Sequence, residues 1–249
     1  MHEFCKAAQL RVGEVDNAEL AKINCYALEP LKAEDIFAFK VIAGDNRPDD
    51  RNSEPFTAES IQDMAKLYAG KPMIWEHGRG QKGSEQIARV YEAAAVATGK
   101  SLEDGTPEMQ LVLKAYMLNN ESTKDLIAEI RAGIKKEVST SCRPKKLVCS
   151  ICGADNMVAY CRHWAGHSYD GKTCQMTIDG VKDVFEISFV GIPAQPRAGV
   201  SKAKRYNPDL PEKKPSDFND EEKKEARFDE KELVEMELFL MAEEAAEEE

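Results

Sequence analysis

Short apolar segments separated by hairpin-length gaps are the feature that most constrains how this chain of 249 residues can fold. Each segment is rich in β-branched, aromatic or alternating apolar residues, which is typical of a strand with a buried face. We expect strands at 36–43, 72–77, 87–96, 109–118, 137–144, 175–178 and 184–192. The pattern predicts a mostly antiparallel β-barrel or sandwich with flanking helices, an α+β arrangement rather than a doubly wound α/β sheet.

Two helices are expected among these strands. The first begins after Thr57, whose hydroxyl can cap a helix, and stops at Gly70. The second begins at Ser122, where the spacing of a capping box is present with Asp in place of the usual Glu, and it ends at Gly133. Residues 18–27 fit a strand or a short helix equally well, so neither is preferred.

Charge divides the chain into a body and a tail. The net charge is −11, and most of the acidic excess lies in 202–249, an acidic segment with a proline-containing linker at 207–220 and a helix-prone end. The nearly neutral body argues against tight electrostatic binding to nucleic acid. No apolar run reaches the roughly 18 residues that a membrane span needs, and the N-terminus lacks the pattern of a signal peptide. We therefore expect a reducing, cytosolic setting.

In such a compartment, cysteines close in sequence are more often metal ligands than disulfides. Cys149 and Cys152 form a C-x-x-C-G knuckle, and Cys161 and His163 follow within a short distance. Three thiolates and an imidazole at this spacing are typical of a tetrahedral zinc site, and four protein ligands would make the zinc structural. The expected ligands are Cys149, Cys152, Cys161 and His163.

Two alternatives remain open in this region. His167 or Cys174 could replace one of the last two ligands. A redox C-x-x-C of the thioredoxin type is the other interpretation, but no βαβ pattern surrounds the motif. We assign residues 145–175 to a zinc-knuckle insert within a larger domain that spans 1–201.

Three expected strands each end or pass close to a polar side chain that could serve a hydrolase. The stretch 137–144 carries Ser139 and Ser141, the run 72–77 ends at His77, and the last strand carries Glu186. A serine, a histidine and a carboxylate delivered to one point form the arrangement of a serine hydrolase. Each of these residues alone would be a weak signal.

The sequence around these residues strengthens the interpretation. The relevant stretches are Phe56-Thr57-Ala58-Glu59, residues 67–72 with Gly70-Lys71-Pro72, His77, Ala88-Arg89-Val90-Tyr91, Glu137-Val138-Ser139 and residues 185–198, where Glu186-Ile187-Ser188 precedes Pro193-Ala194-Gln195-Pro196-Arg197-Ala198. Together they resemble the prohead maturation proteases of tailed bacteriophages, over about residues 36–201. The resemblance implies a β-barrel related to the herpesvirus assemblin proteases and an endopeptidase activity.

Under this resemblance, Ser139 is the nucleophile, His77 its base and Glu186 the acid that orients the imidazole. Asp183 is the alternative acid, and alternation along a strand lets only one of the two carboxylates point inward. The family usually has Ser-x-Gly-Phe at the nucleophile, whereas this chain has Ser-Thr-Ser-Cys from Ser139. A side chain in place of that glycine would crowd the approach to a substrate, and Ser141 is a second candidate nucleophile.

The resemblance also implies partners and a place of action. It points to cleavage of phage scaffold and major capsid protein segments, in the host cytoplasm inside the assembling procapsid, with activation by homodimerisation as in assemblin-like enzymes. Membrane association is not expected. The altered motif favours a second hypothesis, a catalytically inactive scaffold or capsid-core protein with a structural zinc knuckle.

Overall fold

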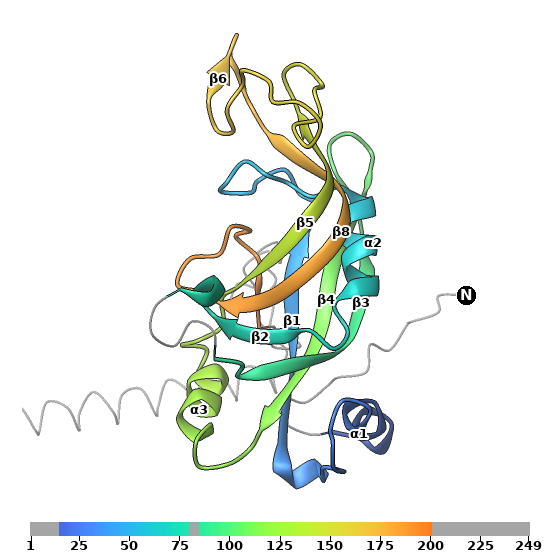
Figure 1. Ribbon diagram of the computed structural model, residues 1–249, viewed down its shortest axis with the longest axis vertical. Coiled ribbons are helices and arrows are strands. Elements are labelled where there is room, and N and C mark those ends of the chain that lie inside the picture. The colour runs from blue at the N-terminus through green and yellow to red at the C-terminus, as the bar shows by residue number, and fades with distance from the viewer. Residues whose placement is uncertain (1–14, 80–84, 201–249) are drawn as a thin grey trace, which may run out of the picture. The chain divides into compact units, whose positions relative to one another are not determined.

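A seven-stranded sheet organises residues 15–79 and 85–200, the parts of the chain that the computed structural model describes (Figure 1). The order of strands across the sheet is β5-β8-β2-β3-β4-β1-β9. Neighbours are antiparallel except for β2 and β8, which run parallel. The strands are β1 (Ile36–Asp45), β2 (Pro72–Trp75), β3 (Ala88–Ser101), β4 (Pro107–Leu118), β5 (Val138–Cys149), β8 (Met176–Phe189) and β9 (Gly199–Val200), with a separate hairpin of β6 (Ser168–Tyr169) and β7 (Lys172–Thr173).

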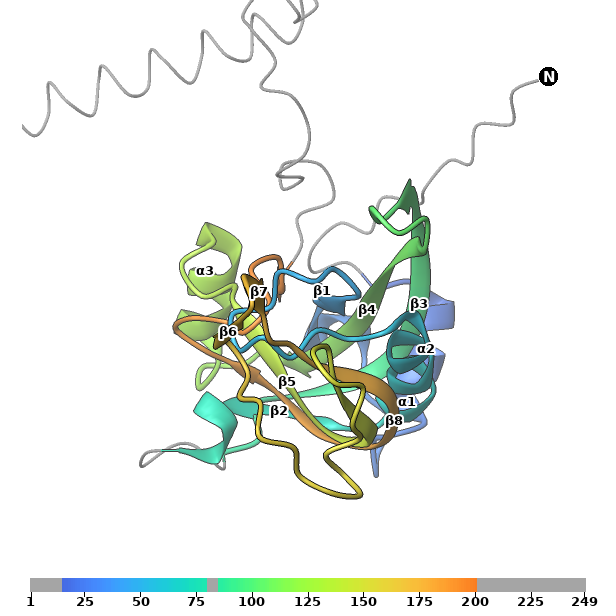
Figure 2. The same cartoon turned by 90° about the horizontal axis from the view of Figure 1, so that it is seen from above.

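The sheet curls into a half-barrel around one hydrophobic core. Figure 2 shows the strands curving about a common centre, with α2 (Ala58–Leu67) on one side and α3 (Lys124–Ala132) on the other. The remaining helices are α1 (Asn17–Asn24) and the single turns η1 (Ala33–Asp35) and η2 (Glu76–Gly78). The largest fully buried side chains include Phe37, Ile61, Met64, Tyr68, Met73, Leu111, Leu113 and Ile187. The expectation of a mostly β chain with few helices is confirmed.

Helix α2 begins after Thr57 as its sequence predicts, but it ends at Leu67, with Tyr68 as its C-cap, rather than at Gly70. The Thr57 hydroxyl accepts a hydrogen bond from the N–H of Ser60 at 3.2 Å, which satisfies one of the free N–H groups of the first turn. Ile61, Met64 and Tyr68 form the buried stripe. The Tyr68 hydroxyl donates to the backbone carbonyl of Glu186 at 3.1 Å, so the helix fixes the position of β8.

Two further expected boundaries are wrong, and the assignment left open at 18–27 is settled as a helix. Residues 17–24 are helical, with Asp16 as the N-cap. The N-cap of α3 is Thr123 rather than Ser122, because the Ser122 hydroxyl donates to Asn120 instead of closing a capping box. The two strands expected at 175–178 and 184–192 are one continuous strand, β8, whose polar middle suggested a gap.

The two ends of the curled sheet meet at Gly199. This residue pairs with Ile42 of β1 and forms a bridge with Glu137, directly before β5. The N–H of Val200 donates to the carbonyl of Lys136 at 2.6 Å. A Cβ atom on Gly199 would lie 2.9 Å from that carbonyl oxygen, so only glycine allows the backbones to approach this closely. Gly199 therefore links the two ends of the half-barrel, and we call its contacts with Ile42, Lys136 and Glu137 the clasp.

The acidic tail that we expected at 202–249 lies outside the described residues. So do the first residues of the expected 1–201 domain.

Gly199→Ala tests the clasp. We expect the substitution to lower the free energy of unfolding by about 1–3 kcal/mol, because backbone must move to accept the methyl group. Gly191→Ala is the matched control, since no atom lies within 4 Å of the added Cβ there. Urea unfolding of both variants measures the difference; equal stabilities of the two would show that the clasp tolerates a side chain.

Candidate functional site

His77, Glu186 and Ser188 form a connected group of hydrogen bonds. The His77 Nδ1 lies 2.8 Å from Oε1 of Glu186. The other carboxylate oxygen, Oε2, accepts a hydrogen bond from the Ser188 hydroxyl at 2.6 Å, and that hydroxyl accepts the backbone N–H of His77 at 3.0 Å. Ser188 is fully buried and Glu186 nearly so. Both carboxylate oxygens are thus satisfied, and His77 is held at two points, its ring nitrogen Nδ1 and its backbone N–H.

The turn that carries His77 has an unusual backbone. We expected a strand through His77, but β2 ends at Trp75 and the next two residues are left-handed, with φ of 44° at Glu76 and 54° at His77. Such a conformation costs on the order of 1–3 kcal/mol per non-glycine residue. The N–H of Gly191 donates to the Glu76 carboxylate at 3.0 Å, and the N–H of Arg79 donates to the Glu76 carbonyl at 3.0 Å. These contacts and Ser188 hold the turn so that the imidazole reaches Glu186.

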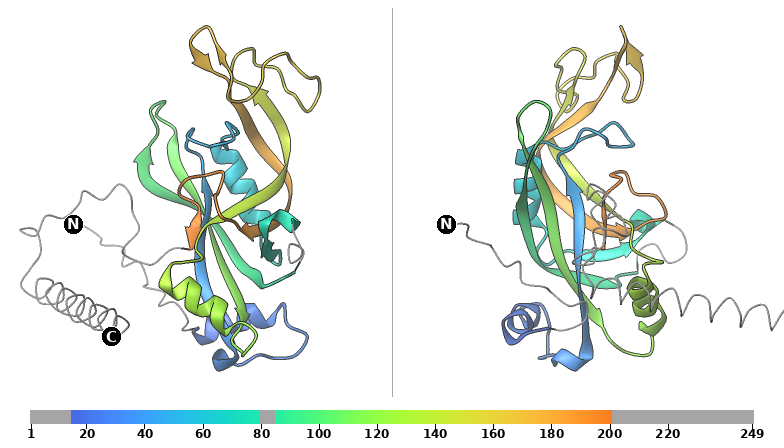
Figure 3. Two further views of the ribbon diagram at one scale, coloured as in Figure 1. Left: turned by 90° about the vertical axis from the view of Figure 1, so that its left-hand side faces the viewer. Right: turned by 180° about the vertical axis from the view of Figure 1, so that it is seen from behind.

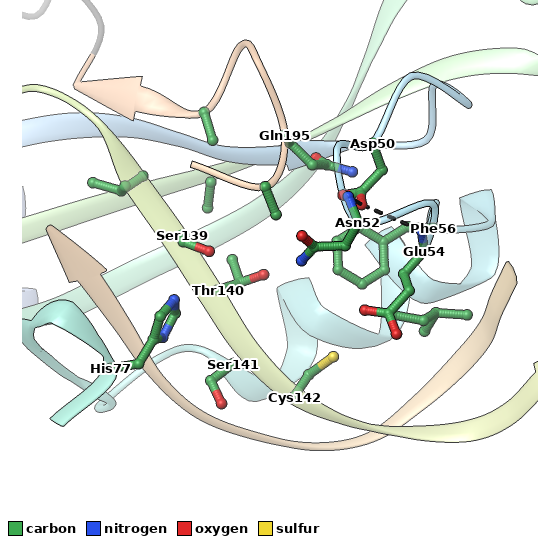
Figure 4. Close-up of a pocket in the computed structure, with 15 residues that line it drawn as sticks. Asp50, Asn52, Glu54, Phe56, His77, Ser139, Thr140, Ser141, Cys142 and Gln195 are labelled. Carbon is green, nitrogen blue, oxygen red and sulfur yellow. Dashed lines mark hydrogen bonds between the residues drawn. The ribbon is translucent and has the colours of Figure 1, made fainter. Parts of the chain in front are cut away.

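The strand next to β8 brings the two candidate nucleophiles to the same place. In the register of β5 with β8, Ser139 lies opposite Ser188 and Ser141 lies opposite Glu186. Residues directly opposite each other share a face of the sheet. Figure 4 shows the His77 imidazole beside the part of β5 that carries both serines, and all three residues line one pocket of about 230 Å³. The structure therefore assembles Ser139, His77 and Glu186, with Ser141 also within the group.

The contact with Glu186 has a consequence for the proton on the imidazole. Within the described ranges, the ring of His77 has no hydrogen-bond partner besides that carboxylate. In a neutral imidazole the nitrogen that faces a carboxylate carries the proton, and the other nitrogen keeps a lone pair. Nδ1 is then the donor, and Nε2 is able to accept a proton from a serine hydroxyl.

Asp183, the alternative acid, is engaged elsewhere. Its Oδ1 lies 3.3 Å from Nζ of Lys71, and the hydrogen bond with this ammonium group lowers the pKa of the Asp183 carboxyl. The alternation that we used to separate Asp183 from Glu186 is interrupted, because the register shifts between their partners on β5 and leaves Phe185 unpaired. A bulge of this kind re-aims the side chains beside it. Among the two carboxylates, only Glu186 contacts the histidine.

Cys142 is the third reactive side chain on this part of β5. Burial raises the pKa of its thiol to about 11, and the negative charge of Glu54 contributes in the same direction. The thiol is therefore protonated at neutral pH and is a weak nucleophile. A serine is the better candidate at this site.

A second cluster lies at the far end of β5 and β8. One ligand atom each from Cys149, Cys152, Cys161 and His163 lies within 4.8 Å of all the others, a group that could hold a metal ion. These are the four residues expected from the sequence. Cys149 is the last residue of β5, and Figure 3 shows this end of β5 and β8 extending past the half-barrel, with the β6–β7 hairpin at its tip. Since β5 runs through 145–149, the insert proper is the connection 150–175.

Local contacts orient these ligands. The left-handed Gly153, with φ of 72°, lets its N–H donate to the Cys149 carbonyl at 2.9 Å and turns the knuckle. Burial acts to raise the pKa of the Cys149 thiol, but the N–H groups of Cys152 and Ile151 outweigh it and lower the pKa to about 7. The Tyr169 ring packs edge-on against the His163 imidazole, with 4.6 Å between centroids. A thiol that ionises near neutral pH and a braced imidazole suit a metal ligand set.

The two alternative ligands behave differently. His167 is exposed and is not part of the cluster. Cys174 is buried, with its Sγ 3.8 Å from that of Cys149, and burial raises the pKa of its thiol to about 11. Its thiol also interacts electrostatically with those of Cys152 and Cys161, so Cys174 remains an alternative to one of the four ligands.

Sequence reasoning missed the other wall of the pocket. Asp50, Asn52 and Glu54 were part of a loop without an assigned role, yet they line the pocket together with Gln195. Two hydrogen bonds bring these segments together: the Arg51 N–H donates to the Ala194 carbonyl at 2.9 Å, and the Asp45 N–H donates to the Gln195 side-chain oxygen at 2.6 Å. The partners are about 150 positions apart, and no local signal in the sequence marks them.

Comparison with family models finds no match, and searches of curated proteins and of solved structures find no significant similarity either.

The tautomer of His77 is the first test of this geometry. In nitrogen NMR spectra of the neutral imidazole, we expect Nδ1 to carry the proton and Nε2 to be unprotonated, because the Glu186 carboxylate accepts from Nδ1. Glu186→Ala should remove this preference, whereas Asp183→Ala should leave it unchanged. A His77→Gln spectrum identifies the signals among the four histidines. An unprotonated Nδ1 in the wild-type protein would contradict the arrangement.

Proposed function

We propose that this chain is a serine endopeptidase in which Ser139 is the nucleophile, His77 the general base and Glu186 the orienting acid. The observation that carries the proposal is the 2.8 Å contact between His77 Nδ1 and Glu186 Oε1, next to a strand that presents serines to the same pocket. A carboxylate, an imidazole and a serine hydroxyl in series activate the hydroxyl at neutral pH, where serine alone is unreactive.

The chemistry follows from these roles. The Ser139 oxygen attacks the carbonyl carbon of a peptide bond, and its proton passes to Nε2 of His77. Glu186 stabilises the imidazolium that forms and stays ionised. The imidazolium then gives the proton to the leaving amine, which breaks the peptide bond and leaves an acyl group on the serine. Water, activated by the same imidazole, releases the acyl group as a carboxylic acid and restores the enzyme.

The resemblance to prohead proteases supports a narrower proposal. A β-half-barrel with this serine, histidine and acid suits the assemblin-like fold of that family, with scaffold and major capsid protein as substrates in the host cytoplasm and a homodimer as the active form. Among the described residues, no helix combines the length and apolar character that crossing a bilayer requires. The Ser-Thr-Ser-Cys run from Ser139 favours the second candidate, an inactive scaffold or capsid-core member of the family.

We propose that the second cluster holds a structural zinc ion. Three thiolates and one imidazole are a donor set that zinc prefers, and four protein ligands leave no position for substrate. The cluster joins the end of β5 to the connection that leads into β8. The ion would supply a cross-link between the end of β5, the strand that carries Ser139, and the connection that follows it.

Metal analysis tests the zinc site. We expect the purified full-length protein to hold about one zinc per chain. Cys152→Ser should reduce the zinc content well below one and lower the melting temperature, because a ligand is lost. Cys25→Ser is the control, since Cys25 is exposed and outside the cluster. Wild-type protein with far less than one zinc per chain, even after refolding with zinc, would exclude the site.

The nucleophile is tested by co-expression with the phage scaffold and capsid proteins, followed by intact mass measurement. We expect defined fragments with wild type, a loss of cleavage of about a thousandfold or more in Ser139→Ala, and a much smaller change in Ser141→Ala. Cleavage that persists in Ser139→Ala and stops in Ser141→Ala would move the nucleophile by two residues. No cleavage by folded, zinc-loaded protein would favour the inactive scaffold member.

A further inference from the structure

We propose that the pocket beside the serines binds a basic side chain, lysine or arginine, of the peptide substrate, and that Glu54 is the residue that selects it. This inference rests on the proposed endopeptidase function, because it assigns the substrate class of the same site. Three observations carry it: the composition of the pocket walls, the charges that face the pocket, and the contacts that fix the loop bearing Glu54.

The pocket has apolar walls and a polar far end. Its volume is about 230 Å³. The apolar walls come from Ala43, Phe56, Val138, Ile178, Ala194 and Ala198. In Figure 4 the Glu54 carboxylate lies on the side of β5 toward which Thr140 and Cys142 point. Walls of this kind suit the methylene chain of lysine or arginine, and a carboxylate suits its charged head.

The charges that face the pocket are of one sign. Asp50 and Glu54 are the carboxylates of the lining, and no lysine or arginine is among the lining residues that the structure describes. Asp50 is already engaged, because its Oδ1 accepts the N–H groups of Asn52 at 2.8 Å and of Glu54 at 3.2 Å. In the described part of the chain, the Glu54 carboxylate has no hydrogen-bond or ion-pair partner. Glu54 is therefore the group left to meet a cation.

The environment of Glu54 supports this role. Burial raises the pKa of its carboxyl, and the charge of Asp50 adds to the effect. A half-buried carboxylate without a counter-ion gains more from a cationic ligand than an exposed one does. An acidic substrate side chain in the same pocket would meet two negative groups, and this repulsion disfavours acidic residues at that position of the substrate.

The loop that carries Glu54 is fixed before substrate arrives. The N–H of Met176 donates to the Ser53 carbonyl at 2.8 Å, and the N–H of Ile178 donates to the Pro55 carbonyl at 2.9 Å. Both donors belong to β8, the strand that also carries Glu186. Glu54 is thus held relative to the candidate acid by backbone hydrogen bonds on either side of it. A pre-positioned carboxylate selects ligands more sharply than a mobile one, because no ordering is needed on binding.

Cleavage-site mapping tests the selection. Wild-type protein is incubated with β-casein, a largely unfolded substrate, and the new termini are identified by mass spectrometry. We expect lysine or arginine at one fixed position relative to the cut, favoured about tenfold or more over glutamine. Glu54→Gln should remove the preference while Ser139-dependent cleavage persists. Glu103→Gln, an exposed glutamate in the β3–β4 turn, is the matched control and should keep it.

A binding measurement separates failure of this inference from failure of the proposed function. The probe is n-butylguanidinium, titrated by NMR into Ser139→Ala protein, with neutral n-butylurea for comparison. We expect the cation to shift signals of the pocket, and the Glu54→Gln substitution to weaken its binding about tenfold. Glu54-dependent binding without any cleavage would contradict the proposed endopeptidase function but support the proposed cation-binding pocket. Ser139-dependent cleavage with no basic preference, or binding that Glu54→Gln leaves unchanged, would overturn the inference.

Discussion

The pairing of β5 with β8 is the interaction on which the rest of the structure depends. Its ladder extends from Val138 and Phe189 at one end to Cys149 and Met176 at the other. One end sets the serines opposite the acid, and the other end carries the first thiol of the cysteine cluster. Each backbone hydrogen bond of the ladder fixes the position of the residues beside it. The serine–histidine–glutamate group and the cysteine cluster are therefore attached to one continuous pair of strands. The loop that lines the pocket is bonded to the same strand β8.

Regular pairing alone would not produce the site, and two local irregularities complete it. The register shift that leaves Phe185 unpaired comes directly before Glu186, and the left-handed turn at Glu76 and His77 comes directly after β2. Both depart from ideal geometry at the places where the side chains converge. Irregular backbone persists only where surrounding contacts hold it, and the turn is held by hydrogen bonds with Ser188 and Gly191.

Local chemistry made part of this predictable. The cap at Thr57 and the close grouping of the four cysteine and histidine ligands follow from residue type and spacing, and both are found. The end of β2 and the continuity of β8 were misjudged, because both depend on contacts between segments far apart in sequence. The pocket wall at Glu54 could not be predicted for the same reason: the residues on either side of Glu54 are bonded to β8, more than 100 positions away. The choice between Ser139 and Ser141 as the proposed nucleophile rests on chemistry that neither strand period nor register decides.

The clasp at Gly199 has a consequence for synthesis of the protein. The strand that closes the half-barrel is the last described element of the chain, and Ala194, Gln195 and Ala198, which line the pocket, come just before it. A ribosome must therefore have translated the chain to about residue 200 before the pocket has all its walls. Until then β5 and β1 have no bridge between them, and the serines face an incomplete site.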